Sequence, residues 1–156
     1  MPGVTFRGRD VWVYDDGGRK AAGFDGATGD CVTRAIAIAT GLPYREVYDA
    51  INAAAAHERP GAWTRRRGTR RSHARTGVYR ATKDRVLIAL GWTWTPTMTI
   101  GSGCRVHLRR DELPSGRLIV KVSKHTVAVI DGVIRDTHDP SRGGTRCVYG
   151  YWRKAE

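Results

Sequence analysis

The feature that most constrains this fold is a short turn, Asp131-Gly132, between two segments rich in β-forming residues. Asp-Gly is typical of a two-residue β-hairpin turn, because both turn positions need positive φ. With this turn Ile130 pairs with Val133, and the register then follows residue by residue along both strands. Side chains alternate between the two faces of a strand, so His125 and Asp136 are predicted to share a face as diagonal neighbours, about 7 Å apart by backbone.

The rest of the sequence divides into helical and strand-like parts. Cys31 opens an apolar helical pattern that Gly41 ends, and Pro43 begins a second one, so a helical hairpin is expected over residues 31–55. A third helix is predicted from about Thr82 to Gly91. Strands are predicted at residues 4–14, 92–95, 118–122, 125–130, 133–137 and 147–152. This order predicts one α+β domain over residues 1–156, with N-terminal helices packed on a C-terminal antiparallel sheet.

Positive charge is concentrated in one segment of the chain, which has 27 Lys and Arg against 15 Asp and Glu. Ten of these bases and one acid lie between residues 59 and 85. Residues 59–80 show no hydrophobic periodicity, so they are predicted to form a basic loop. Such a loop binds the phosphates of nucleic acid or an acidic partner, or is simply solvated. The clustered candidates for binding are Arg65, Arg66, Arg67, Arg70 and Arg71.

The composition argues against a membrane protein and against a secreted disulfide framework. The longest apolar run, residues 118–122, is far shorter than the roughly 20 residues of a membrane helix, and no signal-peptide pattern opens the chain. The three cysteines are odd in number and widely spaced, without the pairing typical of a zinc site. Cys104 and Cys147 are interpreted as structural. We expect a cytoplasmic protein without metal or other cofactor.

Cys31 is the first candidate for chemistry. At the start of a helix, the helix dipole and the free N–H groups favour its thiolate and can hold an oxyanion. A buried structural cysteine is the alternative interpretation. His125 is predicted to act as the base and Asp136 as the acid that orients it, which is the logic of a nucleophile–base–acid triad. An error of register would replace them with His138 and Asp139.

These residues resemble the papain-like cysteine peptidases. Gly29-Asp30-Cys31 and the helix after it resemble the nucleophile helix of that superfamily, whereas His125 with residues 128–132 and Asp136-Thr137 resembles its histidine strand and its Asn or Asp position. Similar combinations occur in small proteins encoded by phages and prophages. The resemblance implies a papain-like fold and a peptidase or isopeptidase that attacks an amide bond of a protein or peptide substrate, in a bacterial host's cytoplasm or a virion. Cys31, His125 and Asp136 are its implied catalytic residues.

One group expected from the resemblance is missing. Papain-like enzymes usually place a Gln shortly before the nucleophile, where its amide donates to the oxyanion, and this sequence contains no Gln. Asp25 and Thr28 occupy that approach, and because an ionised Asp25 would repel an oxyanion, Thr28 and the Cys31 N–H are the expected donors. Losing one donor costs about 10²–10³ in turnover.

Two alternative functions follow. One is a weak or inactive papain-like scaffold that binds nucleic acid or an acidic partner through its basic loop. The other is acyl transfer or deamidation with the same three residues. The basic loop could also cover the active-site cleft and select acidic substrates.

Overall fold

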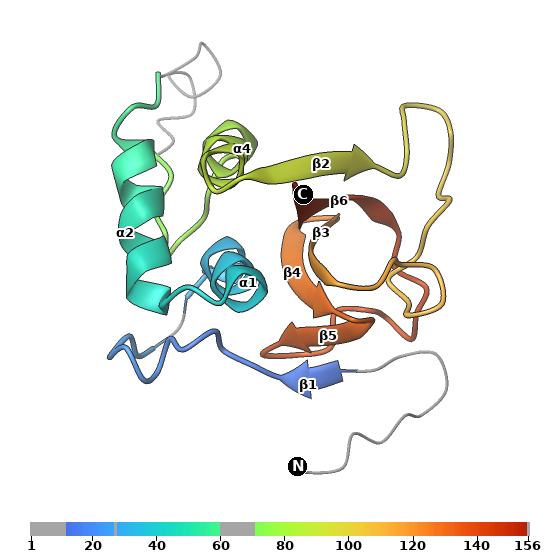
Figure 1. Cartoon of the computed structure of the whole chain (residues 1–156), viewed down its shortest axis with the longest axis horizontal. Helices are drawn as coiled ribbons and strands as arrows, with labels where there is room; N and C mark the ends of the chain where they lie inside the picture. The colour runs from blue at the N-terminus through green and yellow to red at the C-terminus, as the bar shows by residue number, and fades with distance from the viewer. Residues whose placement is uncertain (1–11, 27, 60–70, 156) are drawn as a thin grey trace.

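The computed structural model describes residues 12–26, 28–59 and 71–155 (Figure 1). In chain order the elements are β1 (Trp12–Tyr14), α1 (Cys31–Thr40), α2 (Tyr44–Ala55), α4 (Arg80–Ala89), β2 (Trp92–Pro96), β3 (Arg117–Val122), β4 (His125–Ile130), β5 (Val133–Asp136) and β6 (Val148–Lys154). Within these ranges none of the helices has the combination of length and hydrophobicity that a bilayer crossing requires.

The α+β class is confirmed, with one correction to the direction of the strands. Six strands form a single sheet in the order β1-β5-β4-β3-β6-β2. All pairs are antiparallel except β1 and β5, which run parallel. The expected antiparallel sheet is therefore mostly but not wholly antiparallel, because β1, within the strand predicted before the helices, pairs in parallel with β5. A parallel pair needs a long crossover connection, and the chain from β1 through the helices to β5 supplies it.

The register of the β4–β5 hairpin follows the prediction. Ile130 is paired with Val133 and Val129 with Ile134. The two turn residues have positive φ, 49° at Asp131 and 78° at Gly132. The hairpin consequently places the first residue of β4 and the last residue of β5 near the same end of the sheet.

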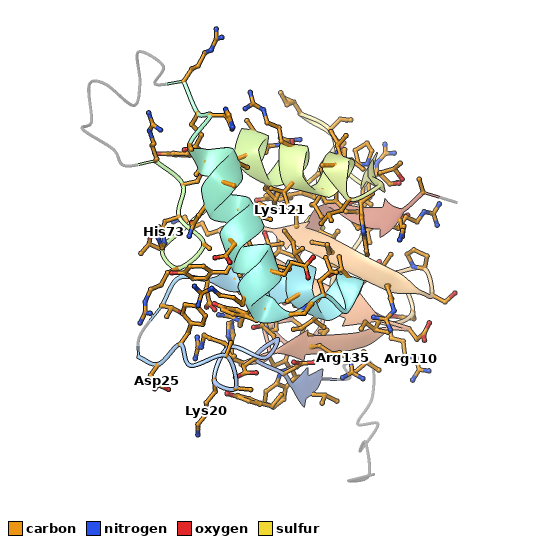
Figure 2. All side chains as sticks on the ribbon, turned by 60° about the vertical axis from the view of Figure 1, so that its left-hand side comes forward. Lys20, Asp25, His73, Arg110, Lys121 and Arg135 are labelled. Atoms are coloured by element: carbon orange, nitrogen blue, oxygen red, sulfur yellow. A yellow bond between two sulfur atoms is a disulfide. The ribbon has the colours of Figure 1, made fainter. Side chains whose placement is uncertain are left out.

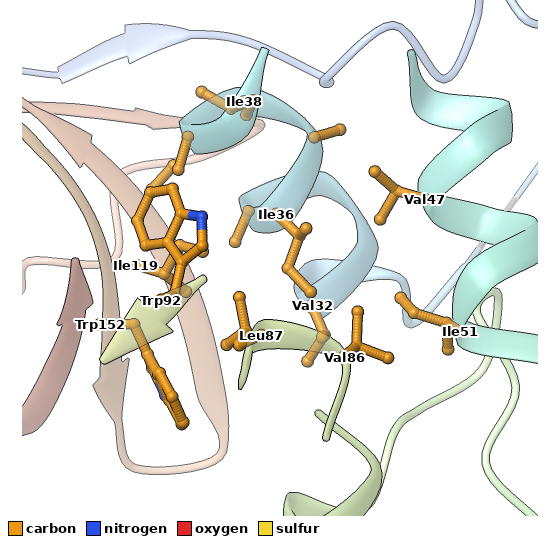
Figure 3. Close-up of a cluster of buried hydrophobic side chains, with 14 of the residues drawn as sticks. Val32, Ile36, Ile38, Val47, Ile51, Val86, Leu87, Trp92, Ile119 and Trp152 are labelled. Atoms are coloured by element: carbon orange, nitrogen blue, oxygen red, sulfur yellow. The ribbon is translucent and has the colours of Figure 1, made fainter. Parts of the chain in front are cut away.

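Apolar residues are buried on both faces of the sheet. On one face, α1 lies between the sheet and the outer helix α2, while α4 lies beside α1 and reaches the sheet at β2 (Figure 1). Figure 3 shows the resulting core, in which side chains from the three helices meet Trp92, Ile119 and Trp152 of the sheet. The other face buries a second cluster, which includes Leu108 and Val120. Because α1 is covered on every side, its residues from Val32 to Ala39 are all buried.

The helix ends agree with the sequence signals that predicted them. Gly41 adopts the left-handed conformation at φ 75° after α1, and its N–H donates to the Ala37 carbonyl. Pro43 directly precedes α2, as its fixed φ favours. The third predicted helix, α4, begins at Arg80, two residues earlier than expected. Gly41 thus ends the helix whose first residue is Cys31.

Cys104 and Cys147 form a disulfide, with their Cα atoms 5.7 Å apart. The sequence analysis did not predict this pair, because the two residues are 43 positions apart and the cysteine count is odd. The folded chain brings them together, since His107 forms a β-bridge with Cys147. The remaining cysteine, Cys31, is free.

Candidate functional site

Cys31 lies at the exposed start of a buried helix. It is the first residue of α1, partly buried, and it lines a cleft of about 500 Å³. The preceding residue, Asp30, makes no side-chain hydrogen bond to the helix N-terminus. The first N–H groups of an α-helix have no partner within the helix, and the first two residues of α1, Cys31 and Val32, both line the cleft. This is the environment in which a thiolate and an oxyanion are both stabilised.

The structure brings His125 and Asp136 together beside this cysteine. The Nε2 atom of the His125 ring is hydrogen-bonded to Asp136 Oδ2 at 2.6 Å. The Cys31 thiol is the second partner of the ring, because its charge and side-chain interaction with the imidazole raise the pKa of His125. Since Nε2 is engaged by Asp136, Nδ1 is the nitrogen left for sulfur. The two side chains are mostly buried, 12% exposed for the histidine and 3% for the aspartate. Residues from α1, β4 and β5 therefore form one continuous hydrogen-bonded chain.

The alternative base and acid are placed differently. The His138 side chain is 58% exposed, and its Nδ1 lies 4.0 Å from Asp136 Oδ1. Asp139 accepts a hydrogen bond from the backbone N–H of Ser141 and caps a local turn. The geometry therefore favours His125 and Asp136, the pair that the predicted register indicated.

The electrostatics of this chain favour charge separation between sulfur and imidazole. Burial by itself raises the pKa of the Cys31 thiol, but the hydrogen bond and charge of His125, together with the Thr126 N–H and Arg34, hold that pKa below its ordinary value. Burial opposes protonation of His125, yet its bonds to Asp136 and Cys31 raise its pKa to about 9. Both shifts favour a thiolate–imidazolium pair over the neutral thiol and imidazole.

A buried polar network behind the triad was missed by the sequence analysis. Asp30 is 1% exposed and accepts hydrogen bonds from Arg34, from the Thr28 hydroxyl at 2.6 Å and from the Tyr44 hydroxyl at 2.7 Å. Arg34 also reaches Asp136 Oδ1, at 3.1 Å from its Nη2. The guanidinium therefore links the start of α1 to the acid of the triad. The i,i+4 spacing of Asp30 and Arg34 was the signal that could have revealed it.

The structure corrects both predicted oxyanion residues. Thr28 lines the cleft, but its hydroxyl donates its only proton to Asp30. Asp25 is exposed and lies at the outer edge of the molecule (Figure 2), and it does not line the cleft. Neither side chain is placed to donate to an oxyanion. The backbone N–H groups of Cys31 and Val32 are the donors that the helix start offers instead.

The predicted basic loop is described only in part. Four of the predicted binding residues, Arg65, Arg66, Arg67 and Arg70, lie outside the described residues. Arg71 is exposed and donates to the Ala56 carbonyl just after α2, at 3.0 Å. Further along, residues 76–78 form one wall of the cleft. The chain just before this wall is held against α1, because the Thr33 hydroxyl donates a hydrogen bond to the Ala74 carbonyl at 2.6 Å.

One group of side chains in the described ranges has metal-ligand chemistry. Atoms of His125, Asp136 and His138 lie within 4.8 Å of one another. However, one Asp136 oxygen is bonded to His125 and the other accepts from Arg34 at 3.1 Å. A guanidinium at that distance would repel a metal cation. The arrangement therefore fits proton transfer better than metal binding.

A thiol and an imidazole thus meet in one cleft, with the Asp136 carboxylate buried behind the imidazole, and each of the three comes from a different element of secondary structure. The cleft carries Cys31 at a helix N-terminus and is lined by lysine and arginine side chains. No protein-family model, curated protein or solved structure matches this chain. What the site does is therefore argued from its own geometry and chemistry.

Proposed function

We propose that this protein is a papain-like cysteine hydrolase that cleaves an amide bond in a protein or peptide. Cys31 is the nucleophile, His125 the general acid and base, and Asp136 the residue that orients the imidazole. The observation that supports this most strongly is the His125 ring, which is hydrogen-bonded to Asp136 at 2.6 Å, lines the same cleft as Cys31 and interacts with its thiol. A histidine with only a structural role does not need a thiol as its second partner.

In the first half of the reaction, the Cys31 thiolate attacks the carbonyl carbon and forms a C–S bond. The carbonyl electrons move to oxygen, and this oxyanion is stabilised by the free N–H groups at the start of α1. As the C–N bond breaks, the imidazolium of His125 gives its proton to the leaving nitrogen. The products of this half are a free amine, a neutral imidazole and a thioester on Cys31.

In the second half, water attacks the thioester while neutral His125 takes a proton from it. The C–S bond then breaks, the carboxylic acid product leaves, and the thiolate–imidazolium pair is restored. Asp136 remains ionised throughout. Burial raises its pKa, but His125, the Thr137 N–H and Arg34 together lower that pKa by more. Deamidation and acyl transfer share the first half and differ only in the leaving group or the acceptor.

The rate of Cys31 alkylation by iodoacetamide, measured against pH, tests this proposal. Cys31 is the free cysteine, so a mass shift reports on it alone while the disulfide stays oxidised. The raised pKa of His125, about 9, predicts rapid alkylation well below the ordinary thiol pKa of about 8.5. In His125→Ala the rate should titrate like that of an isolated thiol.

His138→Ala is the matched control, because it removes a neighbouring histidine whose ring centroid lies 5.1 Å from that of His125. Its alkylation profile should follow the wild type. A wild-type profile that already titrates near pH 8.5, or one that His125→Ala leaves unchanged, would overturn the proposal.

A further inference from the structure

A small cavity adjoins the active-site cleft and shares three cationic residues with it. The cavity encloses about 80 Å³, against about 500 Å³ for the cleft. Arg80, Lys83 and Lys121 line both. The other walls of the cavity come from Asp84, Trp94, Tyr149 and Trp152. A cavity with aromatic walls and positive charge therefore lies directly beside the cleft.

Lys83 is the most unusual of these residues. It is only 5% exposed, and none of the ion pairs among the described residues includes it. The nearby acid, Asp84, pairs instead with Arg80 at 3.8 Å. Burial and the charge of Lys121 lower the pKa of Lys83 to about 8. Lys83 thus holds a cation in a largely buried place, where the described residues supply no ion-pair partner within contact distance and desolvation is costly.

Lys121 extends from β3 and lies between α4 and the sheet (Figure 2). Its Nζ donates to the His125 carbonyl at 3.3 Å, which leaves two of its three protons free of described partners. Lys121 and Lys83 both interact electrostatically with the Cys31 thiolate. Arg80 is the more neutralised cation, since it pairs with Asp84 and stacks on the Trp94 ring with its guanidinium carbon 5.7 Å from the centroid.

We propose that Lys83 and Lys121 form a subsite for the carboxylate of an Asp or Glu side chain next to the scissile amide. The inference rests on the proposed hydrolase function and names its substrate class. The cavity, at about 80 Å³, is much smaller than the cleft of about 500 Å³. That space suits a short carboxylate side chain. The aromatic walls pack against the side-chain methylenes while the two ammonium groups pair with the carboxylate.

Two isosteric probes test the charge of the subsite. The probes are the aspartyl and asparaginyl fluoromethyl ketones. In both, the Cys31 thiolate displaces fluoride and forms a thioether. They differ only in the side chain, which ends in a carboxylate in the first and an amide in the second. Their relative rate cancels any change in the fraction of Cys31 that is ionised. The wild type should react faster with the aspartyl probe. In Lys83→Gln and Lys121→Gln that preference should fall on the order of tenfold, as expected for a unit charge lost within a few ångströms.

Lys154→Gln, at the exposed end of β6, is the control and should keep the wild-type preference. Lys121→Arg retains the charge and should also keep it. Two results overturn the subsite. One is a wild-type rate that is nearly equal for the aspartyl and asparaginyl probes, and the other is a rate ratio that both glutamine variants leave unchanged. Iodoacetamide, which is neutral, is measured in parallel. If the pH dependence of its rate is that of an ordinary thiol, the hydrolase proposal itself fails. If Cys31 is reactive but shows no preference for the aspartyl probe, only the subsite proposal fails.

Discussion

The guanidinium of Arg34 joins two buried carboxylates, and replacing it tests how the site is held together. Arg34 is 6% exposed, pairs with Asp30 within α1 and reaches Asp136 on β5 at 3.1 Å. Arg34→Met keeps much of the side-chain volume and removes the charge. Both carboxylates then remain buried without their cation.

The expected cost follows from this burial. Removing one partner of a buried ion pair costs about 3–5 kcal/mol, because an uncompensated charge remains in a poorly solvated place. For a chain of this size, this corresponds to a fall in Tm of roughly 6–20 °C. The pair formed by Arg45 and Asp49 has the same residue types and also spans four helical positions, but its side chains are 67% and 62% exposed. Arg45→Met should therefore cost at most about 0.5 kcal/mol.

The loss in Arg34→Met should also depend on pH. The pKa values of Asp30 and Asp136 lie below the ordinary value, since hydrogen bonds and nearby cations outweigh burial. Their contribution to stability is present above the unfolded pKa of about 3.9 and is lost as pH falls through the folded pKa. Without Arg34 these carboxyls bind protons more readily, so the variant should lose less stability at pH 4 than at pH 7.

Urea unfolding followed by far-UV circular dichroism measures this difference at both pH values, with the disulfide kept oxidised. Equal losses for Arg34→Met and Arg45→Met at pH 7 would refute the reasoning, because burial would then make no difference. A loss that is the same at pH 4 and pH 7 would show that the carboxylates are not the groups destabilised.

Two further predictions concern the thiol and the disulfide. In Cys31→Ala the pKa of His125 should fall from about 9, because the thiolate no longer stabilises the imidazolium. NMR titration of the ring protons measures this pKa. An unchanged value would contradict the interaction between thiol and imidazole. Cys104→Ser opens a cross-link across 43 positions, and loop entropy predicts a loss of up to about 4 kcal/mol in urea unfolding. The wild type with its disulfide reduced should lose a similar amount, and equal stability of the oxidised wild type and the variant would exclude a stabilising disulfide.

Several parts of the fold and the candidate site were predictable because neighbouring residues determine them. Asp131 and Gly132 adopt the positive φ values that their turn needs, and this fixed the register that places His125 near Asp136. Gly41 likewise marked the end of α1 and so located Cys31 at its start. Turn chemistry and helix signals act within a few residues, so a sequence shows them directly.

Contacts between distant segments were decided only by the tertiary structure. The sequence placed β1 before the helices but did not indicate that it joins β5 in parallel. Nor did it show that Lys83 would be buried without an acid, or that Thr28 would give its proton to Asp30. Such contacts depend on how whole elements pack. The sequence therefore determined the residue types of the triad and their local geometry. Packing of α1 against the sheet decided that the three side chains meet. Hydrophobic burial drives this packing and is not directional, so the sequence pattern alone does not show which faces come together.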